Sequence, residues 1–176
     1  KRSDLRLVGI DKNKRNIEAA RLALERAGLY GSRAAVFQWD KDTLPFTTYM
    51  FNLIVSDGAI ARSRLPDPSP EVLRVLRPYG GCVCVGRPAT TKGVHGKLDR
   101  AQVTQWLQQS SMTEATWTND GGVWAVVRRG AVPGAGEWTQ LYADSGHTAC
   151  SRDELRGPMV IQWFGEPGPR EIIDRH

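Results

Sequence analysis

The sequence predicts an α/β fold in which parallel strands alternate with helices and an antiparallel hairpin ends the series. Three observations support this class. Short apolar segments rich in β-branched residues recur between longer amphipathic segments. Two predicted strands are followed by an acidic residue, at Asp11 and at Asp40. The run Asn119-Asp-Gly-Gly122 joins the last two strands with residues that suit a tight hairpin turn.

The first part of the chain predicts a strand, a helix and a second strand. Residues 6–10 form an apolar run that favours a buried strand. A helix should begin at Lys14 and stop at Gly28. Its inward positions are Ile17, Ala20, Leu24 and Ala27, and its outward positions are Arg15, Glu18, Arg21 and Glu25. Residues 34–37 predict the next strand, with Gln38-Trp39-Asp40 at its carboxyl end.

A third strand is predicted at residues 51–55, after the turn Leu44-Pro-Phe46, with Ser56-Asp57-Gly58 at its carboxyl end. Ser69-Pro70-Glu71 then offers an N-cap, a proline at the first helical position and an early acid. The predicted helix directs Val72, Val75 and Leu76 inward. Pro78-Tyr-Gly-Gly81 should end it.

The remaining predicted elements are a strand, a helix and the hairpin. Residues 82–85 predict a buried strand. Asp99 and Gln102 have the spacing of a capping box at the start of a helix. That helix should bury Val103, Trp106 and Leu107. The hairpin then pairs residues 113–118 with residues 123–128.

Composition excludes several classes of protein. The chain of 176 residues is long enough for a core, and no apolar run approaches the roughly 20 residues that cross a bilayer. The net charge is +5, but the basic residues are scattered and include only short clusters at residues 62–64 and 128–129. A solvated surface explains such clusters, so we do not expect a nucleic-acid partner. The opening Lys1-Arg-Ser-Asp4 has no apolar signal region.

Cysteine and histidine give no pattern typical of a metal site. Cys82 and Cys84 lie on one face of a predicted strand, where we expect small core residues. His95 lies in a glycine-containing loop, where surface exposure is more common than acid–base catalysis. His147 and His176 have no ligand spacing relative to a cysteine or to each other.

The order of these elements, together with the turn Leu76-Arg-Pro-Tyr-Gly-Gly81, resembles the class I S-adenosylmethionine-dependent methyltransferases over residues 4–129. The resemblance implies a Rossmann-like methyltransferase sheet with strand order 3-2-1-4-5-7-6. The family's first strand and glycine loop have no counterpart here and would lie upstream of Lys1. Asn52 also departs from the usual Asp, and Tyr79 is an extra residue in the Pro-Gly-Gly turn.

The resemblance implies a site for S-adenosylmethionine. Asp11 would bind the ribose with Lys12 beside it, Trp39 would cover an adenine face, and Asp40 would accept the adenine amino group. Ser56 would border the cofactor and acceptor pocket together with Asp57, the candidate general base for an unknown methyl acceptor. Each residue also has a structural explanation. Asp11 could cap the next helix and Asp40 could stabilise a turn, because Asp is common in both places. Trp39 could be a packing residue, and Ser56-Asp57-Gly58 is also a common turn sequence.

Loss of the central first strand would leave two half-sheets with unpaired edges. Unsatisfied buried backbone groups cost roughly 1–3 kcal/mol each, so we expect this chain alone to bind the cofactor poorly and to be inactive. Micromolar affinity in calorimetry would refute this expectation.

The end of the chain predicts a change of module. Residues 130–136 are rich in glycine, proline and alanine, as in a linker. Residues 137–176, with Gly136-Glu-Trp-Thr139 at the junction and the turn His147-Thr148, resemble the beginning of a quinoprotein-like β-propeller. The combination resembles large bacterial propeller proteins with a methyltransferase-like domain. Pyrroloquinoline quinone would belong only to the parent's propeller, and an isolated propeller strand should leave this tail mostly irregular.

Three functions therefore remain open. The first is S-adenosylmethionine-dependent methyl transfer, the second a noncatalytic nucleotide-fold scaffold joined to a propeller, and the third an NAD-dependent dehydrogenase. An active methyltransferase would be cytoplasmic, whereas the propeller resemblance favours a periplasmic or exported protein. The hairpin favours the methyltransferase over the dehydrogenase, whose sheet is usually parallel throughout.

Overall fold

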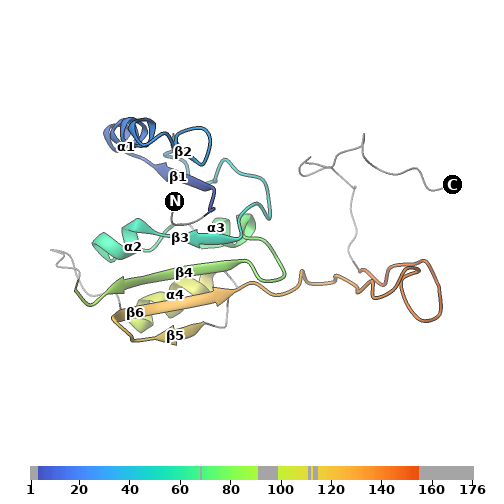
Figure 1. The fold of residues 1–176 in the computed structure, drawn as a ribbon. Helices are drawn as coiled ribbons and strands as arrows, with labels where there is room; N and C mark the ends of the chain where they lie inside the picture. Colours follow the sequence, from blue (N-terminus) through green and yellow to red (C-terminus); the bar gives the residue numbers. More distant parts are fainter. Residues whose placement is uncertain (1–3, 68, 91–98, 111, 113–114, 155–176) are drawn as a thin grey trace. The chain divides into compact units, whose positions relative to one another are not determined.

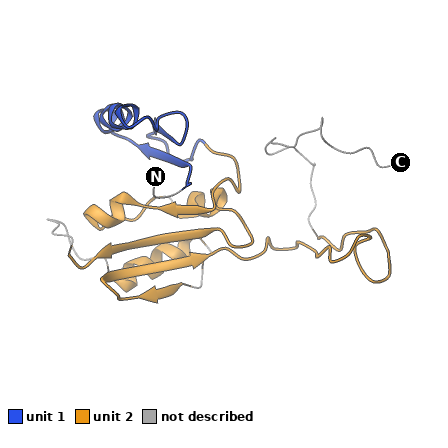
Figure 2. Cartoon of the chain, viewed as in Figure 1, with its two compact units in different colours: residues 1–45 blue, residues 46–176 orange. Residues whose placement is uncertain are grey.

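The computed structural model describes residues 4–67, 69–90, 99–110, 112 and 115–154. It confirms the α/β class, with parallel and antiparallel strands. The chain forms two compact units, Lys1–Pro45 and Phe46–His176 (Figure 2). No helix in the described part of the chain is long and apolar enough to cross a membrane.

Unit 1 contains β1 (Leu7–Asp11), α1 (Lys14–Arg26) and β2 (Ala34–Gln38). The two strands are parallel, and their register runs from Leu7 opposite Ala34 to Asp11 opposite Gln38. Asn13 caps α1, since its side chain accepts a hydrogen bond from the backbone N–H of Arg15 at 2.9 Å. Gly28 follows the helix with φ +67°, as predicted.

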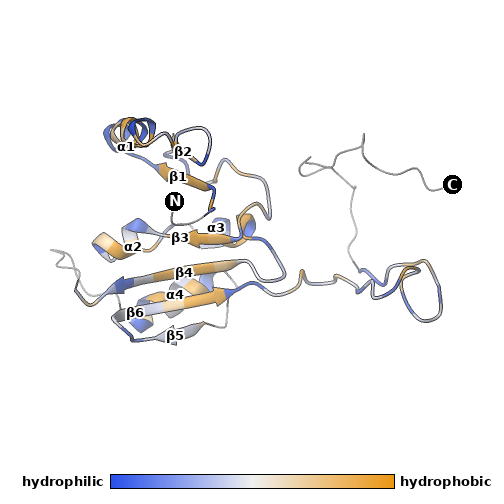
Figure 3. Cartoon of the chain, in the orientation of Figure 1, coloured by the Kyte–Doolittle hydropathy of each residue, from blue (hydrophilic) through white to orange (hydrophobic). Residues whose placement is uncertain are grey.

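The prediction that β1 is buried is wrong. Leu7, Val8 and Ile10 are 58%, 39% and 41% exposed, and Figure 3 shows the strand as apolar. The described strands give β1 only one neighbour, β2, so its other edge carries no strand partner among them. In unit 1 the buried hydrophobic residues among those described are Ile17 and Ala34.

The inward face of α1 is also less buried than predicted. Ile17 is buried, Ala20 and Leu24 are half-buried, and Ala27 is exposed. Arg21 was expected outside, but it is half-buried because its guanidinium donates to the carbonyl oxygen of Val36 at 3.0 Å.

Unit 2 contains a four-stranded sheet with the order β3-β4-β6-β5 (Figure 1). The strands are β3 (Leu53–Val55), β4 (Cys82–Pro88), β5 (Thr116–Thr118) and β6 (Gly122–Arg128), and the helices are α2 (Asp57–Arg62), α3 (Ser69–Val75) and α4 (Arg100–Gln109). β3 and β4 are parallel, whereas β6 is antiparallel to both β4 and β5. The predicted final hairpin is therefore confirmed.

The core of unit 2 lies between this sheet and the helices α3 and α4. It contains Val72, Leu76, Val83, Val85, Val103, Trp106, Leu107, Met112, Ala125 and Val127. Full burial of one such aliphatic side chain contributes about 1.5–3 kcal/mol. The inward positions predicted for the two helices are confirmed.

The opposite face of β4 is only partly covered. Cys82 and Cys84 alternate with the buried Val83 and Val85, and both cysteines are half-buried. The expectation that Cys82 and Cys84 are core residues is confirmed only in part, because neither is fully buried, and Cys150 is exposed. Partial burial raises the pKa of Cys84, and the nearby Cys82 adds to the increase.

The helices α3 and α4 begin in different ways. The capping box of α4 is present: Asp99 accepts from the Gln102 N–H at 2.8 Å, and the Asp99 N–H donates to the Gln102 side chain at 3.3 Å. The N-cap prediction at Ser69 is wrong. Ser69 is itself the first residue of α3, and its buried hydroxyl has no hydrogen-bond partner among the described residues.

The turn before β4 depends on glycine. Tyr79 and Gly80 have φ values of +57° and +107°. A Cβ atom on Gly81 would lie 2.1 Å from the carbonyl oxygen of Arg77, which no side chain allows. Gly81 therefore permits the close approach that leads the chain into β4.

The separation into two sheets follows the expectation drawn from the resemblance. If the strands are numbered as in the methyltransferases, β1 and β2 correspond to strands 2 and 3. The order of the other sheet then corresponds to 4-5-7-6. These two orders match the two half-sheets that the resemblance predicts.

The described part of the tail, residues 129–154, contains no helix or strand apart from an isolated bridge between Gln140 and Ala143. Local hydrogen bonds organise it instead, including one from the Glu154 N–H to the Gly134 carbonyl oxygen at 2.8 Å. Residues 155–176, the rest of the segment that resembles the beginning of a propeller, lie outside the described residues.

Candidate cofactor-binding site

Four of the predicted cofactor residues lie where β1 and β2 end. Asp11 is the last residue of β1 and pairs with Gln38, the last residue of β2. The Trp39 N–H donates to the Asp11 carbonyl oxygen at 3.0 Å. Parallel strands present their carboxyl ends at one edge, so unit 1 brings Asp11, Lys12, Trp39 and Asp40 to the same edge.

Asp11 organises the start of α1. Its Oδ1 accepts from the Asn13 N–H at 2.7 Å, and its Oδ2 accepts from the Asn16 side-chain amide at 2.8 Å. The N-cap of α1 is Asn13, so the alternative that Asp11 caps this helix is wrong. Asp11 supports the helix start through its hydrogen bonds to Asn13 and Asn16.

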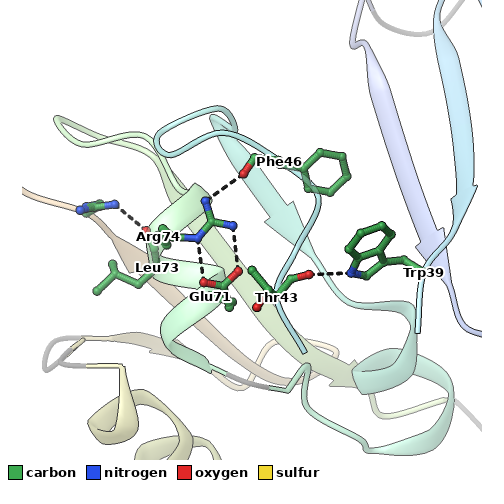
Figure 4. A network of polar contacts seen from close by, with 7 residues as sticks. Trp39, Thr43, Phe46, Glu71, Leu73 and Arg74 are labelled. Carbon is green, nitrogen blue, oxygen red and sulfur yellow. Dashed lines mark hydrogen bonds and ion pairs between the residues drawn. The ribbon is translucent and has the colours of Figure 1, made fainter. Parts of the chain in front are cut away.

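Trp39 is held in one orientation by the loop that follows it. Its indole Nε1 donates to the Thr43 carbonyl oxygen at 2.6 Å (Figure 4). Lys41 Nζ lies 5.5 Å from the ring centroid. Asp40 is exposed, and no described residue forms a hydrogen bond or ion pair with its carboxylate. Lys12 is also exposed, and its carbonyl oxygen accepts from the Gln38 amide at 3.3 Å.

In unit 2, Ser56 and Asp57 lie at the carboxyl end of β3, as predicted, and a short helix begins there in place of the turn that was the alternative explanation. Ser56 caps α2, since its Oγ accepts from the Ala59 N–H at 3.2 Å. Asp57 is exposed in the first turn of that helix. An acid in this position stabilises the positive end of a helix, which gives Asp57 a structural role.

Two hollows of unit 2 are lined by described residues, and no predicted site residue is in the lining of either. One, of about 310 Å³, lies beside the ends of α3 and α4, and the other, of about 610 Å³, lies between α4 and the hairpin. The described residues contain no cluster of three or more potential metal ligands. His95 lies outside the described residues.

The sequence interpretation missed the two asparagines that hold Asp11. Asn13 could have been recognised as an N-cap, because Asn is favoured directly before a helix. Asn16 gave no comparable signal, since its role depends on the helical spacing that returns its amide to the strand end.

Solved structures of known proteins share this fold. A putative S-adenosyl-L-methionine-dependent methyltransferase from Methanococcus maripaludis is 18% identical, with a TM-score of 0.56, over 71% of this chain and 67% of that protein. A SAM-dependent methyltransferase from Aquifex aeolicus is 15% identical, with a TM-score of 0.51, over 69% of each chain. The 4+2 cyclase SpnF is 15% identical, with a TM-score of 0.53, over 73% of this chain and 67% of that protein.

These similarities establish the class of fold, the Rossmann-like α/β fold of S-adenosylmethionine-dependent methyltransferases. At such low identity they establish the fold alone. No protein-family model matches the sequence, and none of the curated proteins matches it.

Proposed function

We propose that this chain contributes to an S-adenosylmethionine site at the carboxyl ends of β1 and β2, in a domain that serves methyl transfer to an acceptor that is still unknown. The chain alone is expected to bind the cofactor weakly and to be inactive. The observation that carries the proposal is the meeting of Asp11, Trp39 and Asp40 at one strand edge. Two acids and an oriented aromatic ring suit a nucleoside, which offers ribose hydroxyls, an amino group and a flat base.

Each residue would have a separate task. Asp11 would accept the ribose hydroxyl hydrogens, and the exposed Lys12 would lie beside them. Asp40 would accept from the adenine amino group, for which its exposed carboxylate has no competing partner among the described residues. The indole of Trp39, fixed through Thr43, would cover one face of the base.

The bound cofactor supplies an activated methyl group and its own leaving group. The protein then contributes mainly alignment and exclusion of water. We propose that Ser56 and Asp57 border the acceptor, with Asp57 as the candidate general base. Their position at the carboxyl end of β3 supports this assignment.

A noncatalytic scaffold is the second candidate. Asp11 already holds the start of α1 through two hydrogen bonds, which is a sufficient structural reason for its presence. One protein with this fold is described as a cyclase, so the fold alone does not define the reaction, because one fold serves several chemistries. The antiparallel β5–β6 hairpin favours both candidates over a dehydrogenase.

We also propose that residues 1–129 form the methyltransferase-like domain, residues 130–136 a linker and residues 137–176 the beginning of a propeller-type module. The mainly irregular backbone of residues 129–154 is compatible with a segment that requires further strands.

Binding can be tested by titrating the ¹⁵N-labelled chain with S-adenosylmethionine and with S-adenosylhomocysteine while following amide shifts. We expect weak, saturable shifts around Asp11 and Asp40. Loss of the Asp40 charge in Asp40→Asn should weaken binding about tenfold, the effect of one charge-assisted hydrogen bond. Asp42→Asn, in the same loop, is the matched control and should bind like the native chain.

Three outcomes distinguish the candidates. Absence of saturable shifts with either ligand would overturn the cofactor site. Binding that Asp40→Asn weakens, followed by methyl transfer in an acceptor screen, would establish the enzyme. Binding without transfer to peptide, nucleic-acid or small-molecule acceptors is the result expected of this chain alone; it would establish the cofactor site and leave the scaffold as the second candidate.

A further inference from the structure

The smaller hollow of unit 2 lies at the amino ends of β3 and β4, away from Ser56. Arg128 pairs with Cys82, the first residue of β4, so Arg129 lies at this end of the sheet. The hollow has a volume of about 310 Å³, which is within the range of small-ligand sites. Its polar lining comes from Thr48, Tyr49, Arg74, Gln109, Ser110 and Arg129.

Arg74 is already neutralised. Its Nε and Nη2 donate to the Glu71 carboxylate at 2.7 and 2.8 Å, and its Nη1 donates to the Phe46 carbonyl oxygen at 2.8 Å (Figure 4). The hydrogen bond with Glu71 is the main cause of the raised pKa of Arg74. This pair contributes a fixed wall to the hollow and no net charge.

Arg129 has no acidic partner among the described residues. Its Nη1 donates to the carbonyl oxygens of Leu73 and Leu76 at 2.5 and 2.6 Å, and its guanidinium carbon lies 4.6 Å from the centroid of the Tyr49 ring. A guanidinium has five N–H donors, and its Nε and Nη2 form no hydrogen bond with a described residue. Arg129 is half-buried, so part of its charge is removed from water.

The negative carboxyl end of α3 does not cancel the positive charge of Arg129 completely. The Arg74 carbonyl oxygen accepts from the Tyr49 N–H at 3.0 Å, and the Val75 carbonyl oxygen accepts from the Phe51 N–H at 2.9 Å. Backbone donors therefore satisfy these two carbonyls, which Arg129 does not reach. A helix end carries only about half an elementary charge, and donors that occupy its carbonyls reduce its effect.

We propose that this hollow binds an oxyanion, a phosphate or carboxylate group of a small molecule. Arg129 would contribute its Nε and Nη2, in the two-donor geometry that suits both groups. The Thr48 hydroxyl and the Gln109 amide would add neutral donors. The Ser110 hydroxyl instead donates to the Leu107 carbonyl oxygen at 2.9 Å and shapes the wall. The site is independent of the proposed cofactor site, which lies in unit 1.

Titration of the ¹⁵N-labelled chain with inorganic phosphate, and separately with acetate, tests this proposal. Chloride keeps the ionic strength constant, so general screening is held fixed. We expect saturable shifts at the amides of Thr48, Tyr49 and Ser110. Arg129→Gln should weaken binding about tenfold, whereas Arg128→Gln, which removes the neighbouring exposed arginine, should leave it unchanged.

Arg129→Gln also changes the end of α3, so a second variant separates binding from folding. Thr48→Val keeps every described hydrogen bond of Arg129 and should weaken binding roughly two- to fivefold, as expected for one neutral donor. Stronger binding of phosphate or of acetate would identify the preferred oxyanion. Linear shifts without saturation for both anions, or equal losses in Arg128→Gln and Arg129→Gln, would overturn the site.

Discussion

Two aspartates at similar positions in the sequence have different surroundings. Asp11 and Asp40 both follow predicted strands, yet Asp11 holds Asn13 and Asn16, whereas Asp40 has no described partner. A substitution at Asp11 therefore affects the start of α1 as well as any ligand. Asp40 is the more informative position, because its loss should change binding without changing the described hydrogen bonds.

The thiols should differ in reactivity. Cys150 is exposed, whereas Cys84 is half-buried and its pKa is raised by burial and by Cys82. Since the thiolate is the reactive form, we expect iodoacetamide at pH 7.5 to modify Cys150 at least about tenfold faster than Cys84. Mass spectrometry of digested samples at successive times measures both rates. Equal rates would show that β4 is more open than the structure indicates.

Sequence reasoning at this scale succeeded where the interaction is local. Asp99 with Gln102 and the left-handed Gly28 depend on neighbours within four residues, and both are confirmed. Ser69 and Arg21 failed because distant groups decide their surroundings. Burial leaves the Ser69 hydroxyl without a described partner, and the Val36 carbonyl oxygen draws Arg21 toward the sheet.

At the scale of elements, most strands and helices were predictable, but α2 was not. Ser56-Asp57-Gly58 suits both a turn and a helix start, and the six-residue helix is too short to show a period. Its cap, with Ser before an acid in the first turn, was the available signal. The burial of β1 was overestimated because an apolar run indicates a strand without indicating how many neighbours it has.

The turn before β4 should tolerate no side chain at Gly81. In Gly81→Ala the new Cβ would meet the Arg77 carbonyl oxygen, so we expect a loss of about 1–3 kcal/mol in the free energy of unfolding. Urea unfolding followed by tryptophan fluorescence measures it. Gly130→Ala is the control, since no heavy atom lies within 4 Å of the Cβ position there and its stability should hardly change. Equal losses of stability in Gly81→Ala and Gly130→Ala would contradict the close approach of Gly81 to the Arg77 carbonyl oxygen.

The loop around Asp144 should be sensitive to acid. Burial acts to raise the pKa of Asp144, but donors from Thr148 and Gly146 and the nearby Arg152 outweigh it, so the pKa is lowered from 3.8. A lowered folded-state pKa gives stability that is present above the unfolded value and is lost as the pH falls through the folded value.

The amide shifts of Gly146 and Thr148 should therefore titrate with a midpoint below 3.8. An NMR series between about pH 2 and 6 measures this midpoint, over a range that brackets both protonation states. In Asp144→Asn the transition should disappear. A midpoint at or above 3.8 would contradict the hydrogen-bonded loop.

At the scale of the molecule, the sequence resemblance predicted the division of strands correctly. The separate orders β1-β2 and β3-β4-β6-β5 are those of a methyltransferase sheet without its central strand. The limits of the compact units were not predicted, because 1–45 and 46–176 divide the expected domain internally. That boundary depends on long-range contacts, which local sequence patterns do not report.

The two units should differ strongly in stability. Two strands and one helix surround a small buried set in unit 1, Ile17 and Ala34, whereas unit 2 buries a cluster of ten residues. Small two-stranded sheets are marginal in water, and local stability follows the number of buried apolar groups. Hydrogen exchange monitored by mass spectrometry should therefore show rapid exchange in β1 and β2 and slow exchange in β4, β6 and α4.

Addition of S-adenosylmethionine makes this experiment a second test of the proposed site. A ligand that binds the folded form stabilises it in proportion to its occupancy, so protection should increase in β1 and β2 and less in the hairpin. Asp40→Asn should abolish most of that increase while leaving exchange without ligand unchanged. If β1 exchanges as slowly as β4 without ligand, its exposed apolar side chains are covered in solution. The prediction that the small core limits the stability of unit 1 would then be wrong.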